Sequence, residues 1–245
     1  MNNLSFDPPV TDLLLIDIET VPQYQNYDSL PDNWKPLWID KISKTVPENI
    51  SLPESYLQKA GILAEFGKVI CISTGYFSYN EKKELILRLK TISGHDEKEL
   101  LSRFSELTDR FYKHNNNFQF VGHNIREFDI PYICRRMLIN NLPLPSYMKL
   151  HGAKPWEVRM LDTLHWWRFG DYKNYISLHL LASVLNVPTS KTDMDGSMVQ
   201  EVYYKDNNLP RIVEYCQRDV VVVANVLLRF KNQPLLSQAD ITVVP

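Results

Sequence analysis

Hydrophobic residues form short runs along the first half of the chain, and polar or turn-forming residues separate these runs. Apolar runs of about four to eight residues with such boundaries are typical of buried strands. The pattern predicts four strands, at 12–20, 67–78, 83–92 and 118–124. Asn80 and Glu81 lie between the second strand and the third, which indicates an antiparallel hairpin.

The rest of the chain carries apolar residues at helical spacing. The predicted helices cover 96–114, 127–140, 176–187 and 208–230, and residues 158–167 are predicted to form a short strand that leads into a helix. Asp96 and Ser177 are in position to cap two of these helices. Strands that come first, followed by helices that alternate with a strand, predict an α/β fold in which a mixed sheet has helices on both faces.

We expect residues 1–245 to form a single domain, because the length suits one α/β domain and no glycine-rich boundary divides it. Residues 21–66 show little periodicity and are predicted to be an inserted loop or short-helix region, which in an enzyme is often a rim or a lid. Five prolines interrupt this region: Pro22, Pro31, Pro36, Pro47 and Pro53. The C-terminal tail from about 232 contains Pro234 and Pro245 and is expected to be loose.

Composition narrows the class of protein. The chain is 44% hydrophobic, which is enough for a core, and its formal net charge of −2 excludes a protein that coats nucleic acid by charge alone. That charge still permits a nucleic-acid partner, because bound metal ions would offset an acidic site. Cys71, Cys134 and Cys216 form no CxxC pair, which favours a reducing compartment and argues against a zinc cluster. Since the chain shows no signal-peptide pattern and no long apolar run, we expect a cytoplasmic protein without a membrane partner.

Two acids interrupt the apolar run of the first predicted strand. Asp17 and Glu19 are two residues apart, so in a strand they project from the same face, about 7 Å apart along the backbone. Two carboxylates this close repel each other unless a positive charge lies between them, and a divalent cation such as Mg²⁺ or Mn²⁺ suits these oxygen ligands. The alternative is a half-exposed edge strand with two solvated acids.

Two further acidic segments each have an ordinary explanation when taken alone. Asp129 lies just inside a predicted helix that follows Asn124, where an acid also suits the helix dipole. Tyr215 and Asp219 are separated by one helical turn and share one face of the last helix, as an ordinary surface pair would.

The three segments are more specific when they are taken together. In chain order they are Asp17-x-Glu19, Asn124-x-x-x-Phe128-Asp129 and Tyr215-x-x-x-Asp219. Together they resemble the three exonuclease motifs of the DEDD superfamily, tyrosine subclass. The resemblance is to the 3′→5′ proofreading exonuclease domain of family-B DNA polymerases and to its stand-alone bacterial relatives, over roughly residues 12–230. It implies a ribonuclease H-like fold with a mixed central sheet of about five strands, two divalent cations at the four carboxylates, and 3′→5′ exonuclease activity.

The resemblance also implies a role for each motif residue. Asp17 would bridge both metals, Glu19 and Asp219 would complete the site of the metal that activates water, and Asp129 would hold the second metal. Tyr215 would orient the attacking water. Because a tyrosine hydroxyl has an ordinary pKa near 10, it suits an orienting role better than that of a base.

Four residues are candidate substrate contacts, and for three of them an alternative stays open. Thr20 would offer its backbone to the 3′ end, an idea that rests on the resemblance alone. Asn124 would lie near the terminal nucleotide, or it forms a turn at a strand end. Phe128 would stack on a base, although packing in the core is favoured. Lys191 would contact the scissile phosphate, or it is a solvated loop residue.

A window between 154 and 175 combines aromatic and basic residues in the manner of single-strand binding sites. Its members are Trp156, Trp166, Trp167, Phe169, Tyr172 and Tyr175, with Lys154, Arg159, Arg168 and Lys173. For each of these residues, packing in the core or at its rim is the favoured interpretation. Asp162 is expected to cap a helix, although it could also support the acidic site, and His179 is expected to pack.

The sequence therefore predicts a metal-dependent 3′→5′ exonuclease that acts on single-stranded or frayed DNA. One alternative is an exoribonuclease with the same site, because nothing in the sequence reads a 2′-hydroxyl. Another is a non-catalytic nucleic-acid-binding module, although such a module should have lost a carboxylate and this chain has lost none. Any polymerase or repair partner is left open.

Overall fold

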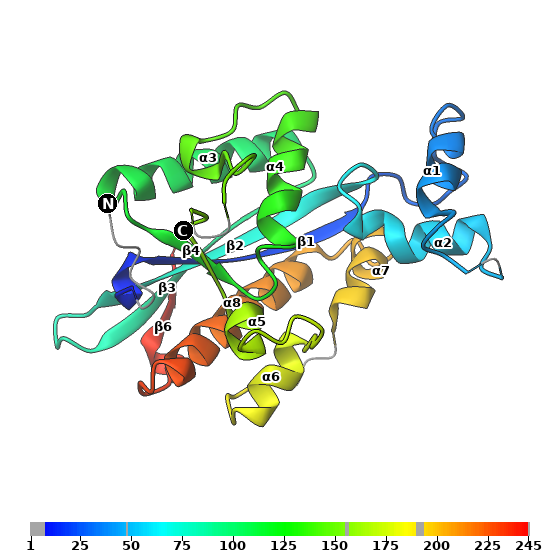
Figure 1. Ribbon diagram of the computed structural model, residues 1–245. Coiled ribbons are helices and arrows are strands. Elements are labelled where there is room, and N and C mark those ends of the chain that lie inside the picture. Colours follow the sequence, from blue (N-terminus) through cyan, green and yellow to red (C-terminus); the bar gives the residue numbers. More distant parts are fainter. Residues whose placement is uncertain (1–7, 48, 155–156, 190–193, 245) are drawn as a thin grey trace.

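A computed structural model describes residues 8–47, 49–154, 157–189 and 194–244, and it shows a mixed sheet with helices on both faces (Figure 1). The strands are β1 (Leu13–Pro22), β2 (Gly67–Tyr79), β3 (Leu85–Ser93), β4 (Gln119–Gly122), β5 (Met160–Asp162) and β6 (Ile241–Val243). Their order across the sheet is β5-β4-β1-β2-β3-β6. The β1–β2 and β2–β3 pairs are antiparallel, and the β1–β4, β4–β5 and β3–β6 pairs are parallel. The predicted α/β class is confirmed, with one strand more than the five expected.

Helices cover both faces of this sheet. The helices are α1 (Lys35–Ile42), α2 (Leu52–Lys59), α3 (Glu97–His114), α4 (Asp129–Ile139), α5 (Thr163–Arg168), α6 (Leu178–Val184), α7 (Val199–Tyr204) and α8 (Leu209–Phe230). Short 3-10 turns lie at Val10–Asp12, Ala60–Ile62, Ser146–Met148, Gly196–Met198 and Gln238–Asp240. Figure 1 shows α3 and α4 on one face of the sheet and α5, α6 and α8 on the other. No helix within the described ranges is long and apolar enough to cross a membrane.

Strand β1 lies in the centre of the sheet, and its two faces enter different cores. Leu14 and Ile16 pack in the core that includes residues of α3 and α4. Leu13 and Leu15 pack with residues of α8, which include Val223. Because side chains alternate along a strand, Asp17 and Glu19 continue the face that looks toward α8.

Helix α8 approaches the sheet closely at a glycine. Gly75 of β2 pairs with Leu15 of β1, and a Cβ added at Gly75 would lie 2.8 Å from Val220 Cγ1 of α8. Real Cβ atoms essentially never come this near to a neighbour, so the present spacing between helix and sheet requires a residue without a side chain at this position.

The region at 21–66 forms a small subassembly that contains helices α1 and α2, in agreement with the predicted short-helix insertion. Its buried centre is made of Leu30, Trp38, Ile42, Tyr56, Ala60 and Phe66. The indole of Trp38 donates to Ser55 Oγ at 3.2 Å. Two tyrosine hydroxyls fix the region to the sheet-and-helix body, since Tyr132 donates to Gly61 O at 2.8 Å and Tyr204 donates to Pro22 O at 2.6 Å.

The C-terminal tail differs from the loose segment that was expected. Strand β6 pairs with residues 87–89 of β3, and Val244 N donates to Leu89 O at 2.8 Å. Before this strand, Leu236 is buried and its backbone N–H donates to the buried Asn225 side chain of α8 at 2.8 Å. The expectation was wrong here because the edge of β3 supplies backbone hydrogen-bond partners for the tail. A strand of only three residues leaves no clear pattern in the sequence from which this pairing could be predicted.

A buried ion pair joins α3 to α4. Glu97, in the first turn of α3, accepts from both Nε and Nη2 of Arg136 in α4, and Asn140 also donates to this carboxylate. Glu97 further accepts from Val69 N of β2 at 2.7 Å, and Arg136 donates to Ala64 O at 2.9 Å. Both side chains are almost fully buried, so each charge depends on this network for its partners.

Candidate active site

Strand β1 places two carboxylates against helix α8. Oxygens of Asp17 and Glu19 and the sulfur of Cys216 in α8 lie within 4.8 Å of one another. The register with β2 shifts directly after Glu19, between Glu19 and Thr20. Irregularities of this kind are common beside active sites, because they bend a strand and aim its side chains.

A turn held by Asp162 brings the third acid to the same place. Asn124 has a φ of 63°, and its carbonyl accepts from the N–H groups of Glu127 and Phe128 just before α4 begins at Asp129. Asp162, at the end of β5, accepts from Asn124 N at 2.9 Å and from Arg126 N at 3.1 Å. The Asp129 carboxylate then accepts a hydrogen bond from the backbone of Ile18, the residue between Asp17 and Glu19.

Helix α8 contributes the fourth acid. Tyr215 and Asp219 are one turn apart, and the Tyr215 hydroxyl donates to the Asp219 carboxylate. Between them, Cys216 Sγ donates to Asp17 O at 3.4 Å, which joins α8 directly to β1. Burial, together with the hydrogen bond to Cys71, raises the pKa of the Cys216 thiol well above its ordinary value, so this residue acts as an S–H donor rather than as a thiolate ligand.

Burial raises the pKa of all four acids, and neighbouring acids raise it further for Asp17 and Glu19. Burial, and then the charges of Asp219 and Asp129, raises the pKa of Asp17 well above its ordinary value. Burial, and then Asp17 and Asp219, does the same for Glu19. Burial raises the pKa of Asp129 to about 7, and it raises that of Asp219 to about 6 in spite of the Tyr215 hydrogen bond and the charges of Arg218 and His179. The charges of Asp129 and Asp219 act on both Asp17 and Glu19, so the four predicted carboxylates lie near one another.

The cluster fits divalent cations. Oδ2 of Asp17 is buried and has no hydrogen-bond partner among the described residues, although buried carboxylate oxygens are nearly always paired. The four carboxylates would hold Mg²⁺ or Mn²⁺, since these hard cations prefer oxygen ligands. A bound cation would also stabilise the charged forms of the carboxylates, which are unfavourable without it.

Residues 62–238 match the sequence model of a family described as a predicted 3′-5′ exonuclease related to the exonuclease domain of PolB. The chain belongs to this family. The matched range includes Asn124, Asp129, Tyr215 and Asp219, and it begins after the β1 acids. No curated protein matches the chain.

Among solved structures, the family B DNA polymerase from the hyperthermophilic archaeon Pyrobaculum calidifontis is similar, with a TM-score of 0.50 and 15% sequence identity. The similarity covers 92% of this chain and 25% of the polymerase chain. At this identity the likeness concerns the fold, and the fold is the ribonuclease H-like one of a polymerase exonuclease domain, as the motifs implied.

Two of the predicted substrate contacts of this exonuclease-family chain line a cavity beside the acids. The cavity has a volume of about 530 Å³ and is bordered by Glu19, Thr20 and Phe128. Its other walls come from the inserted region, from the 3-10 turn Gly196–Met198 and from the start of α7: Pro22, Leu57, Gln58, Gly61, Ile62, Gly196, Ser197 and Gln200, with Ile18 from β1. Phe128 also packs on Tyr132, with ring centroids 5.4 Å apart, so it belongs to both the core and the cavity. The inserted region thus lies at the rim of this cavity, the kind of position that such an insertion often takes in an enzyme.

The other two candidate contacts have different outcomes. Asn124 forms the turn described above, and in addition its side-chain Oδ1 is buried without a hydrogen-bond partner in the part of the chain that the structure describes. Both interpretations of Asn124 therefore remain compatible with its position. Lys191 lies outside the described residues.

Three expectations near the site are refined. Asp162 caps α5 through Leu164 N at 3.0 Å, as predicted. It also accepts from the turn at 124–126 that precedes Asp129, in agreement with the alternative that it supports the acidic site. His179 was expected to pack, which is wrong: it is exposed on α6, and its charge lowers the pKa of Asp219. In the aromatic window, Trp166 and Trp167 pack against hydrophobic clusters, whereas Trp156 lies outside the described residues.

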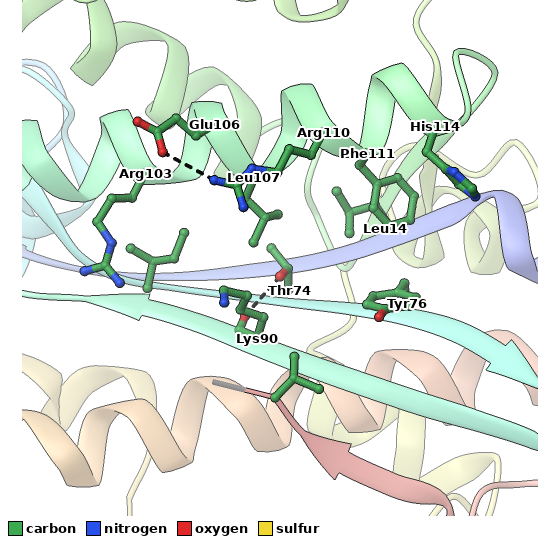
Figure 2. Close-up of a pocket in the computed structure, with 12 residues that line it drawn as sticks. Leu14, Thr74, Tyr76, Lys90, Arg103, Glu106, Leu107, Arg110, Phe111 and His114 are labelled. Atoms are coloured by element: carbon green, nitrogen blue, oxygen red, sulfur yellow. Dashed lines mark hydrogen bonds and ion pairs between the residues drawn. The ribbon is translucent and has the colours of Figure 1, made fainter. Parts of the chain in front are cut away.

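A second cavity, of about 580 Å³, lies between α3 and the sheet (Figure 2). Leu14, Leu107 and Phe111 form part of its apolar lining, and Arg103 and Arg110 lie along α3 beside it. Leu14 points to the face of β1 opposite to Asp17 and Glu19. This cavity is therefore separated from the acidic cluster by the sheet itself.

Proposed function

We propose that this protein is a metal-dependent 3′→5′ exonuclease that hydrolyses phosphodiester bonds at the 3′ end of DNA. The observation that supports the proposal is the convergence of Asp17, Glu19, Asp129 and Asp219 from β1, α4 and α8 into one cluster, in which Glu19 and Asp129 are buried and the other two acids are half-buried. The family match and the ribonuclease H-like fold support the same activity.

In this proposal the four carboxylates would hold two Mg²⁺ or Mn²⁺ ions. When bound, such ions lower the pKa of water and stabilise the charges of the attacking and leaving oxygens. Tyr215 would orient the water: burial, and then the charge of Asp219, raises the pKa of its hydroxyl, so the hydroxyl stays protonated and forms hydrogen bonds rather than accepting a proton. Phe128 and Thr20, on the wall of the adjoining cavity, would bind the terminal nucleotide.

An assay with labelled oligonucleotides tests this function. The purified protein with Mg²⁺ or Mn²⁺ is expected to shorten 5′-labelled single-stranded DNA step by step and to release the label of 3′-labelled DNA first. EDTA should abolish both effects, because without cations the carboxylate cluster has nothing with which to activate water.

The same assay with RNA defines the alternatives. If the protein degraded RNA faster than DNA, it would be an exoribonuclease with the same site. Release of a 5′ label first would contradict the polarity. Binding of oligonucleotides without cleavage of either polymer, in the presence of either metal, would show a non-catalytic binding module instead.

A further inference from the structure

The loop between α5 and α6 exposes three aromatic side chains within seven residues. Phe169 is 91% exposed, Tyr172 is 77% exposed and Tyr175 is 65% exposed, which makes them the three most exposed large hydrophobic side chains among the described residues. Aromatic side chains usually bury most of their surface, so a cluster with this exposure indicates a surface that is covered when a partner binds.

Hydrogen bonds give this loop a defined shape. Phe169 ends α5 with a φ of 44°, in the left-handed region, and Gly170 follows with a φ of 89°. Arg168 spans the loop, since its Nε donates to Asn174 O at 2.9 Å and its carbonyl accepts from Asp171 N at 2.7 Å. The aromatic rings are therefore exposed on a loop whose backbone is held by hydrogen bonds.

The loop is fastened to the segment that carries Asp129. Arg168 Nη1 lies 3.2 Å from Glu127, and His165 Nε2 lies 3.4 Å from the same carboxylate, two residues before Asp129. The Arg168 side chain is only 9% exposed, whereas that of Glu127 is 56% exposed.

At its other end the loop leads to the segment that carries Asp219. It continues into α6, which packs on α8 (Figure 1), and His179 of α6 is near enough to Asp219 to act on its charge. The loop that carries the three aromatic rings thus contacts the segment before Asp129 and leads into the helix whose His179 lies near Asp219.

We propose that Phe169, Tyr172 and Tyr175 form a platform on which bases of a single nucleic-acid strand stack while the 3′ end of that strand lies at the acidic cluster. This inference rests on the proposed nuclease function and names the form of its substrate. Exposed aromatic rings stack on bases of any sequence, and Lys173 within the loop supplies a cation for the phosphates. The inner bases of a duplex offer no free face to these rings, because they are already stacked on one another.

Binding to oligonucleotides measures the platform directly. In an Asp219→Ala background, which prevents cleavage, each single replacement of Phe169, Tyr172 or Tyr175 by alanine should weaken binding of a single-stranded oligonucleotide by about fivefold to 150-fold. Tyr172→Phe should keep the affinity, because the ring remains. The matched control is Tyr79→Ala, which removes a tyrosine that is 61% exposed in the β2–β3 hairpin and should change the affinity by less than about twofold.

Activity on a small substrate separates the platform from the nuclease site. The p-nitrophenyl ester of thymidine 5′-monophosphate has a single base at its phosphodiester and no further bases that could stack on the platform. The triple variant F169A/Y172A/Y175A should hydrolyse this ester at the wild-type rate while its KM for oligonucleotides rises by at least about tenfold. Failure of the wild-type protein to hydrolyse either substrate would overturn the nuclease function itself.

Two results would overturn the platform alone. One is an active wild-type protein whose triple variant binds and degrades oligonucleotides as the wild type does. The other is a triple variant that keeps its affinity for oligonucleotides but loses self-association in sedimentation experiments, which would show that these rings contact a second copy of the chain.

Discussion

Replacing Asp17 with asparagine is expected to lower the exonuclease rate by about a thousandfold or more, and at the same time to make the metal-free protein more stable. Activity falls because a ligand carboxylate at the centre of the cluster is lost. Stability rises because Asp17 is buried among Glu19, Asp129 and Asp219, and its charged form is disfavoured in the fold. In EDTA the melting temperature of Asp17→Asn should exceed that of the wild type by at least about 2 °C.

The dependence of this gain on pH follows from the direction of the pKa shifts. A carboxyl group whose pKa is raised on folding binds its proton more tightly in the folded state, so its contribution to stability is greatest below its ordinary pKa and is lost as pH rises through the folded value. For Asp219 and Asp129 these folded values are about 6 and about 7. In EDTA the wild type should therefore lose stability between about pH 4 and pH 7, and Asp17→Asn should lose less.

The control for both measurements is Asp40→Asn, an exposed acid on α1 that should change neither the rate nor the melting temperature. Full activity of Asp17→Asn with Mn²⁺ would refute the proposed role of this residue. If Asp17→Asn had the exonuclease rate of the wild type and a lower melting temperature, Asp17 would stabilise the fold rather than serve the site.

Replacing Arg136 with methionine is expected to lower the free energy of unfolding by about 3–5 kcal/mol. The loss is large because Glu97 would be left in the interior without the guanidinium that now pairs with both of its oxygens. Since this pair joins α3 to α4, and α4 begins at Asp129, nuclease activity should also decline at temperatures well below the melting point. Urea unfolding, followed by circular dichroism, measures the free energy.

An exposed ion pair on α3 provides the comparison. Arg110 lies 3.8 Å from Glu106, and both side chains are largely exposed, so Arg110→Met should cost no more than about 1 kcal/mol. Adding Glu97→Gln to Arg136→Met should recover part of the loss, because the unpaired charge is removed. Equal costs for Arg136→Met and Arg110→Met would contradict the argument from burial.

Local spacings predicted two pairs of neighbouring side chains, and the resemblance to the DEDD motifs predicted that these pairs meet Asp129 in one site. A separation of two residues puts Asp17 and Glu19 on one face of a strand, and a separation of four puts Tyr215 and Asp219 on one face of a helix. The order of the three motifs then supplied the fold. The functional role of each residue remains a prediction that the variants above test.

What the sequence did not reveal depends on contacts between distant segments. Asp162 was predicted as a helix cap from its neighbours, but its bonds to the turn at 124–126 arise only when β5 lies beside β4. The same holds for His179, which reaches the surroundings of Asp219 through the packing of α6 on α8. Phe169, Tyr172 and Tyr175 were expected to pack, since aromatic residues usually do, and composition alone does not distinguish an exposed ring from a buried one.

Gly75 affects the acidic site although it is not one of the acids, because helix α8 packs against it. Val220, the residue whose methyl group would meet an added Cβ at Gly75, directly follows Asp219 in α8. An alanine at position 75 would force Val220 to shift, and Asp219 is the neighbouring residue in α8. The position of a proposed metal-binding carboxylate therefore depends on the absence of a side chain on the neighbouring strand.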